Sequence, residues 1–109
     1  MLLRRTLPAP ALVSYLDDLA ADIRSRVEPG LRPEGDATLL FRLYALLAVS
    51  KGDQVTARDV HDAWVVWMLE RGEEHRSIVS FDQLDESVRQ KDAPFVTAIR
   101  AAAAARVPR

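Results

Sequence analysis

The sequence predicts an all-α protein, a compact bundle of four main helices plus one short helix. Apolar residues recur at helical steps of three and four along several stretches. Capping residues and glycines bound these stretches, and no stretch has the apolar–polar alternation that is typical of a strand. A length of 109 residues suits one hydrophobic core. We expect a flexible arm over residues 1–10 and a single helical domain over residues 11–109.

The first predicted helix covers about residues 12–27. Its apolar side chains form one stripe, because they are spaced three or four residues apart. The pair Ser14 and Asp17 has the spacing of a capping box and indicates a second possible start, at Tyr15. Proline and glycine after the stripe end the helix. The stripe consists of Leu12, Leu16, Leu19, Ile23 and Val27.

The second predicted helix covers about residues 37–50 and has Asp36 as its N-cap. It is apolar on nearly every side, so we expect it to be central. Its one charged residue, Arg42, should reach the surface or pair with an acid. The side chains expected to pack around this helix are Leu16, Leu19, Ile23, Trp64, Trp67, Phe95, Val96 and Ile99.

The third predicted helix covers about residues 57–71. Thr56 is expected at the N-cap and Asp59 three residues later, which is an aspartate version of the capping box. Gly72 should close the helix. Trp64 and Trp67 share its apolar face, and we expect both to pack in the core unless one of them lines a groove.

A connector over residues 75–92 separates the third helix from the last one. It is too apolar for a spacer and too irregular for one helix. We expect a short helix over residues 86–90, capped by Asp82 or Asp85. Asp92 should cap the last helix, which has a proline in its first turn and continues through an alanine run by intrinsic propensity.

Composition excludes several classes of function. A net charge of −1 lacks the basic excess of nucleic-acid-binding proteins, so we do not expect nucleic acid as a partner. The absence of cysteine removes thiol catalysis and thiolate metal sites, and two histidines are too few for a histidine-rich metal site. No apolar run approaches the ~20 residues of a membrane span. We therefore expect no metal, no cofactor and no membrane, and a cytoplasmic location.

Catalysis is also not expected. His61 and Asp62 are neighbours on a helix, so their side chains point about 100° apart and form no catalytic couple. His61 is expected to be structural, hydrogen-bonded to the last helix or to the connector. The sequence has no glycine-rich phosphate loop and no nucleophile motif. We therefore predict that the chain is not an enzyme.

The C-terminal half carries the pattern of a known family. A histidine and a tryptophan three residues apart are followed by a second histidine, an apolar segment that ends in an aromatic residue, Asp-x-Leu, a basic residue, an aspartate and a late Ala-Ile. These positions are His61, Trp64, His75, Phe81, Asp82, Leu84, Arg89, Asp92, Ala98 and Ile99. The pattern resembles the ryanodine-receptor-type (RyR) domain, over about residues 56–105. The chain departs from it at Arg76, Ser80 and Arg100, where that family has proline.

The resemblance implies a non-enzymatic module that recognises a small-molecule ligand or a protein partner near the connector. RyR domains occur in animal calcium-release channels and as small bacterial and phage proteins. The chain is also similar to a group of short actinobacterial and actinophage proteins. Its basic residues are almost all arginine, which is typical of a GC-rich genome. The candidate binding residues are Trp64, His75, Phe81, Asp82, Arg89 and Asp92.

Two alternatives stay open at this point. The second and third helices, joined by a short turn, could form a helix-turn-helix regulator that reads DNA with the third helix. A phage-encoded protein could instead bind a host protein through an exposed helix face, in the host cytoplasm. The protein could be a monomer or a homodimer.

Overall fold

The computed structural model describes residues 14–106, and it confirms the all-α prediction. The predicted arm over residues 1–10 and the Leu12 end of the first helix lie outside this part. The five α-helices are α1 (Tyr15–Ser25), α2 (Thr38–Lys51), α3 (Ala57–Glu70), the short α4 (Glu86–Arg89) and α5 (Ala93–Ala105). Single 3₁₀ turns lie at η2 (Pro29–Leu31), η3 (Gly52–Gln54), η4 (Phe81–Gln83) and η5 (Gln90–Asp92).

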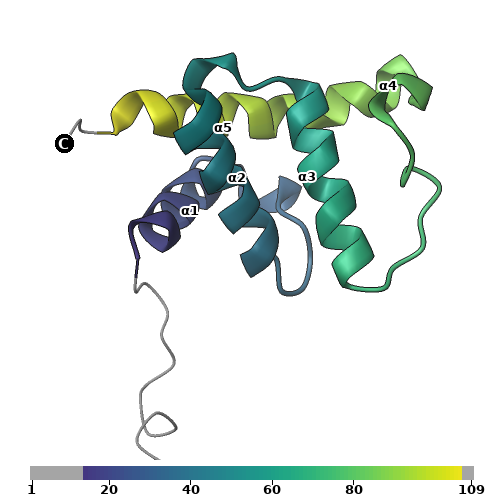
Figure 1. The fold of residues 1–109 in the computed structure, drawn as a ribbon, viewed down its shortest axis with the longest axis horizontal. Helices are drawn as coiled ribbons and strands as arrows, with labels where there is room; N and C mark the ends of the chain where they lie inside the picture. Colours follow the sequence, from purple (N-terminus) through teal and green to yellow (C-terminus); the bar gives the residue numbers. More distant parts are fainter. Residues whose placement is uncertain (1–13, 107–109) are drawn as a thin grey trace, which may run out of the picture.

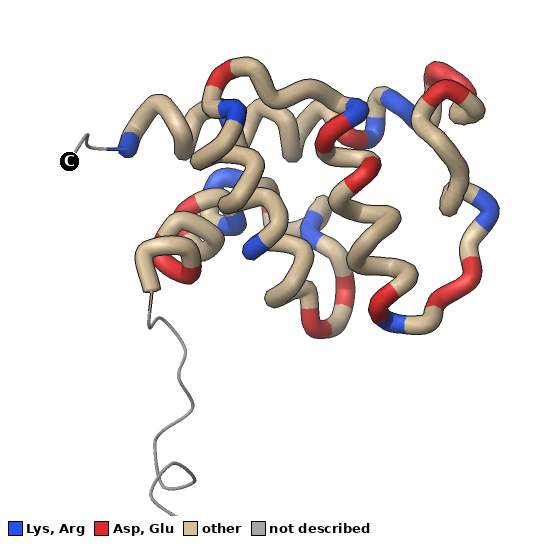
Figure 2. Tube along the Cα trace, viewed as in Figure 1, with Lys and Arg blue, Asp and Glu red and all other residues tan. Residues whose placement is uncertain are grey.

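The core is built around α2, as its apolar pattern predicts. Figure 1 shows α5 passing behind α2 and α3, while α1 packs beside α2. Leu40, Tyr44 and Ala45 of α2 are buried beneath these helices. Of the expected core partners, Leu19, Ile23, Trp67 and Ile99 are buried, and Leu16, Trp64, Phe95 and Val96 pack against them partly exposed. Charged residues of both signs are interspersed along the surface trace (Figure 2).

The alanine run of α5 has a packing role that the sequence reading missed. Within the run, Ala102 is fully buried in the core and Ala103 packs against it. Small side chains allow a helix backbone to approach its neighbours closely, so alanine here provides contact as well as helix propensity. Within residues 14–106, every helix is too short or too polar to cross a lipid bilayer.

The start of α1 follows the second of the two predicted boundaries. The helix begins at Tyr15, and the Ser14 hydroxyl accepts a hydrogen bond from the Asp17 amide at 3.2 Å. The Asp17 carboxylate in turn accepts a 2.7 Å hydrogen bond from Nε of Arg42 on α2. Arg42 therefore pairs with an acid, and this pair ties α1 to α2.

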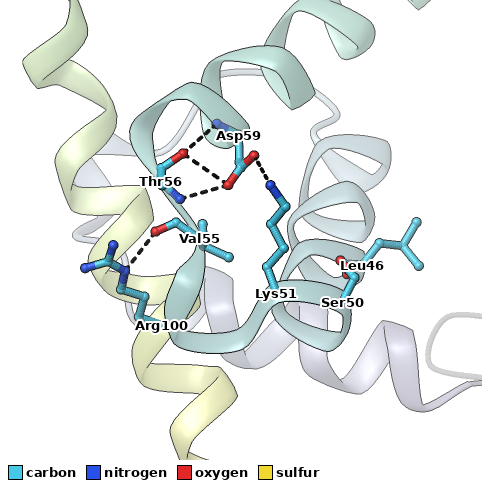
Figure 3. Close-up of polar contacts among 7 residues, drawn as sticks. All are labelled: Leu46, Ser50, Lys51, Val55, Thr56, Asp59 and Arg100. Carbon is cyan, nitrogen blue, oxygen red and sulfur yellow. Dashed lines mark hydrogen bonds and ion pairs between the residues drawn. The ribbon is translucent and has the colours of Figure 1, made fainter.

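The start of α3 is the most fully capped boundary in the described chain. Thr56 and Asp59 form the predicted capping box, in which each side chain accepts from the other residue's amide (Figure 3). Lys51, at the end of α2, donates to the Asp59 carboxylate at 2.6 Å. Arg100 of α5 donates to the Val55 carbonyl at 2.9 Å. Three helices are thus fixed at one corner.

Three predicted caps are wrong in detail. Asp85 stands at the N-cap position of α4, but its side chain makes no capping bond. α2 begins one residue later than expected, because Asp36 accepts from the Thr38 amide at 3.0 Å while Ala37 takes the N-cap position. Asp92 stands at the N-cap position of α5, but it has helical backbone angles and its side chain makes no capping bond. The helix there continues directly out of the preceding 3₁₀ turn, which leaves the Asp92 carboxylate available for another role.

Candidate functional site

A cleft of about 310 Å³ opens between α2, α3, the connector and the start of α5. This volume is at the lower end of the range for small-ligand sites. Its apolar and aromatic walls come from Leu31, Pro33, Tyr44, Trp64, Val88 and Phe95. Its polar groups come from His61, His75, Ser77, Lys91 and Asp92. We refer to it as the connector cleft.

The aromatic side chains of the connector cleft support one another in fixed orientations. Trp64 stacks on His61, with ring centroids 5.8 Å apart and an angle of 27° between the ring planes. The His75 ring meets the other side of this pair edge-on, 5.3 Å from the Trp64 centroid. Tyr44 and Phe95, which also line the cleft, have ring centroids 5.7 Å apart. Each ring is braced by a neighbour, which favours a preformed site over a collapsible one.

Hydrogen bonds to the backbone fix which nitrogen of each histidine carries a proton. The Nε2 atom of His61 lies 2.7 Å from the Val79 carbonyl oxygen, which only accepts, so Nε2 donates. Nδ1 of His75 accepts from the Ser77 amide at 3.0 Å, so the Nε2 atom of a neutral His75 carries the proton. His61 is therefore structural and bonded to the connector, as predicted. His75 orders the connector turn through its bond to the Ser77 amide.

Asp92 is the most distinctive charged group of the cleft. Its carboxyl group is half-buried, and burial raises its pKa to about 6, with the nearby His61 acting in the opposite direction. Tyr44 is 2% exposed, and burial, together with the negative charge of Asp92, raises the pKa of its phenol. Among residues 14–106, the Asp92 carboxylate makes no hydrogen bond and no ion pair. Such a carboxylate keeps its acceptor positions open to a molecule that enters the cleft.

A second cluster lies beside the cleft, on the surface of the connector. The guanidinium groups of Arg58 and Arg89 cover the Phe81 ring at 5.0 and 4.7 Å from its centroid. Arg58 makes two hydrogen bonds to the Asp82 carboxylate, at 2.6 and 3.2 Å, and these hold the pKa of Asp82 below its usual value. Arg89 donates to the Asp82 carbonyl at 3.0 Å. Arg58 therefore ties the connector to α3, and Arg89 holds the connector's own turn. We call this cluster of Arg58, Phe81, Asp82 and Arg89 the arginine clamp.

The six predicted site residues fall into these two groups. Trp64, His75 and Asp92 line the connector cleft, whereas Phe81, Asp82 and Arg89 form the arginine clamp and do not line it. His61 belongs to both groups, because it lines the cleft and its ring lies 6.1 Å from that of Phe81. The sequence reading did not identify Tyr44, Lys91 and Phe95 as cleft residues. Tyr44 could have been noticed as the only hydroxyl in the middle of an apolar helix.

Two other hollows are less suited to a ligand. One, of about 380 Å³, lies between α1 and the start of α2, where the Asp17–Arg42 ion pair already joins its main charged groups. The other, of about 270 Å³, is a shallow groove between α2 and α3 that Leu43, Leu46 and Val66 help to line. We call it the α2–α3 groove. Among residues 14–106, no three His, Cys, Asp or Glu side chains are grouped to hold a metal ion.

The fold and the cleft define a small all-helical domain with one aromatic-walled concave site. The model of a protein family described as a domain of unknown function, DUF7701, matches residues 14–104. The chain belongs to this family. No curated protein matches the chain. No solved structure matches it either. The resemblance of residues 56–105 to the RyR domain stays a prediction.

Proposed function

We propose that the protein is a non-enzymatic binding module that holds a small molecule in the connector cleft. The observation that carries this proposal is the convergence of braced aromatic walls with an unpartnered half-buried carboxyl group, that of Asp92. Ligand sites typically combine mostly apolar walls with a few placed polar groups. A binding module of this kind is also what the RyR resemblance implies.

The arrangement of the histidines favours binding over catalysis. His61 and His75 each use one ring nitrogen to hold the connector backbone, so both act in positioning the cleft wall. A general base needs a nucleophile or a substrate proton within hydrogen-bond reach, and the hydroxyl of Ser77 makes no such bond to either histidine within residues 14–106. We therefore propose recognition without chemistry.

A thermal-shift screen tests this proposal directly. The wild-type protein is screened against nucleotides, nucleotide-derived signalling molecules and common metabolites. A ligand at a hundredfold excess over its Kd should raise the free energy of unfolding by about 3 kcal/mol. Trp64→Ala should abolish the shift, and the matched control Leu69→Ala should keep it, since Leu69 is 59% exposed on α3 and does not line the cleft. A shift that survives in Trp64→Ala would place the ligand elsewhere.

A second candidate function is protein association through α2. Leu39, Leu43 and Leu46 are spaced four and three residues apart, which is the spacing by which a helix pairs with an identical helix. Leu39 is 39% exposed and Leu46 48% exposed, and Leu46 points outward in Figure 3. Exposed apolar stripes of this kind commonly mark interfaces. We propose a second copy of the chain as the partner, related by a twofold axis.

Light scattering after size-exclusion chromatography tests this second candidate. The wild-type mass should rise with protein concentration from one chain toward two. Leu46→Glu should stay monomeric, while Tyr15→Glu, a change at an equally exposed site on α1, should behave as the wild type. A wild-type protein that is monomeric at every concentration would rule out the twofold dimer.

DNA reading by α3 has the weakest support. The exposed side of α3 presents Asp62, Val66 and Leu69, and the one basic residue within the helix, Arg58, is paired with Asp82. Figure 2 shows acidic and basic residues interspersed, without a basic face on this helix. A protein that binds phosphates by Lys and Arg needs such a face. If the wild-type protein bound duplex DNA and the Arg58→Ala variant did not, DNA reading would rank above the other two candidate functions.

A further inference from the structure

Asp92 is held in an unfavourable state by its own fold. Its carboxylate is half-buried at the base of η5, where the expected capping bond to α5 does not form. It also finds no other partner among residues 14–106. Partial burial of a charge without a paired donor disfavours the folded state, whereas asparagine or serine could occupy the same position without a charge. A group that weakens the fold is best explained by a bound partner that satisfies it.

The surroundings of Asp92 indicate what kind of partner fits. Tyr44 approaches from α2, Trp64 and His61 from α3, and Phe95 from the next turn of α5. Aromatic faces carry negative charge density and attract cations, and a carboxylate accepts hydrogen bonds from N–H groups. A positively charged planar group therefore finds both of its requirements in one cleft.

The cleft also contains the cationic side chain of Lys91, which is compatible with a cationic ligand. Lys91 lines the cleft and is exposed, and its charged end is carried on a long flexible stem. Its ammonium group can stay in water while a ligand enters. Among residues 14–106 it makes no ion pair, so it does not neutralise Asp92.

We propose that the ligand of the connector cleft is a small planar organic cation, an amidine, guanidine or amino-heterocycle, whose N–H groups donate to the Asp92 carboxylate while its ring packs against Trp64 and Phe95. This inference rests on the proposed small-molecule function and narrows it to a chemical class. The lysine side chain and the donor nitrogen of His75 stand at the same cleft, so an anionic ligand is the opposite outcome that the experiment must distinguish.

Three nearly isosteric probes separate these outcomes. Benzamidine, benzamide and benzoate share a ring and a planar headgroup but carry charges of opposite sign or none. Their dissociation constants are measured by calorimetry or by titration of amide chemical shifts. The variant is Asp92→Asn, which keeps the shape of the side chain. The matched control is Asp62→Asn, on the exposed side of α3, away from the cleft.

The wild-type protein should bind benzamidine about tenfold more tightly than benzamide, because a hydrogen bond to a charged group is worth about 1.5 kcal/mol or more. Benzoate should bind most weakly. Asp92→Asn should abolish the preference for benzamidine, and Asp62→Asn should preserve it. Loss of folding cannot produce this result, because the neutral side chain removes a buried charge and should stabilise the protein.

Three results would contradict the proposed cationic ligand, and each has a different meaning. If benzamide and benzamidine bind equally well, the cation class is overturned while the small-molecule site survives. If benzoate binds most tightly and Lys91→Gln weakens it, the ligand is an anion and the inference is overturned. If none of the three binds the wild-type protein at millimolar concentration and Trp64 resonances stay unmoved, the inference and the proposed function fall together.

Discussion

The Asp92→Asn substitution should stabilise the protein at neutral pH and leave its stability nearly unchanged at acidic pH. The carboxyl group has a pKa of about 6 in the folded chain, against an ordinary value of 3.8. The folded state therefore holds this proton more tightly than the unfolded state. Asp92 makes almost no electrostatic difference below about pH 3, where both states are protonated, and its destabilising effect grows as the pH rises toward 6. Asparagine removes this effect because it does not ionise.

The size of the effect follows from the rise in pKa. A tenfold change in proton affinity is about 1.4 kcal/mol, so a rise from 3.8 to about 6 corresponds to at most ~3 kcal/mol. Asp92 is half-buried, and solvent screens part of this energy. We therefore expect Asp92→Asn to raise the free energy of unfolding by about 1–2 kcal/mol at neutral pH, and by nearly nothing at about pH 3.5.

Urea unfolding across this pH range, followed by tryptophan fluorescence, provides the measurement. Acid alone should destabilise both proteins, because hydrogen bonds and ion pairs lower the pKa of Asp36, Asp59 and Asp82 in the folded chain. The difference between the wild type and Asp92→Asn cancels these shared contributions. A difference that is the same at every pH, or a substitution that destabilises at neutral pH, would refute the reasoning about Asp92.

Three further predictions concern the fold around the cleft. Thr56→Ala should lower the free energy of unfolding by about 1 kcal/mol in urea denaturation, because it removes one half of the capping box with Asp59, and an unchanged midpoint would show that the box contributes nothing. His61→Ala should speed tryptic cleavage after Arg76 without reducing helix content, because the connector loses its hydrogen bond to α3; equal cleavage rates would contradict this role. Ile99→Val, at a fully buried site, should cost about 1 kcal/mol of stability by calorimetry, and a neutral result would mean that the core repacks there.

The helices could be predicted because each one carries its own local signals. The capping box at Thr56, the glycine after Lys51 and the apolar stripe through Leu19 and Ile23 are all short-range patterns, and the structure keeps each of them. Errors arise where tertiary packing overrides local preference. Asp92 has the right residue type for an N-cap, but the chain enters α5 from a 3₁₀ turn with helical backbone angles at Asp92, and its side chain makes no capping bond.

The connector cleft could be predicted only in part. The resemblance to the RyR domain pointed to Trp64, His75 and Asp92, which do meet in one cleft. It also pointed to Phe81, Asp82 and Arg89, whose contacts with one another and with Arg58 hold the connector in place at the surface. Tyr44 could not be assigned to the cleft, because periodicity shows that a helix is buried but not which neighbour each side faces.

The two walls of the cleft belong to parts of the molecule with different local stability. Tyr44 is embedded in the central helix, whose amides should exchange with deuterium only when the whole domain unfolds. The facing wall is a connector fastened by side chains to backbone atoms, and its amides should exchange through local opening at much lower energy. A ligand that touches both walls would slow exchange in the connector far more than in α2. Slow hydrogen exchange in the connector would then show that the cleft is occupied.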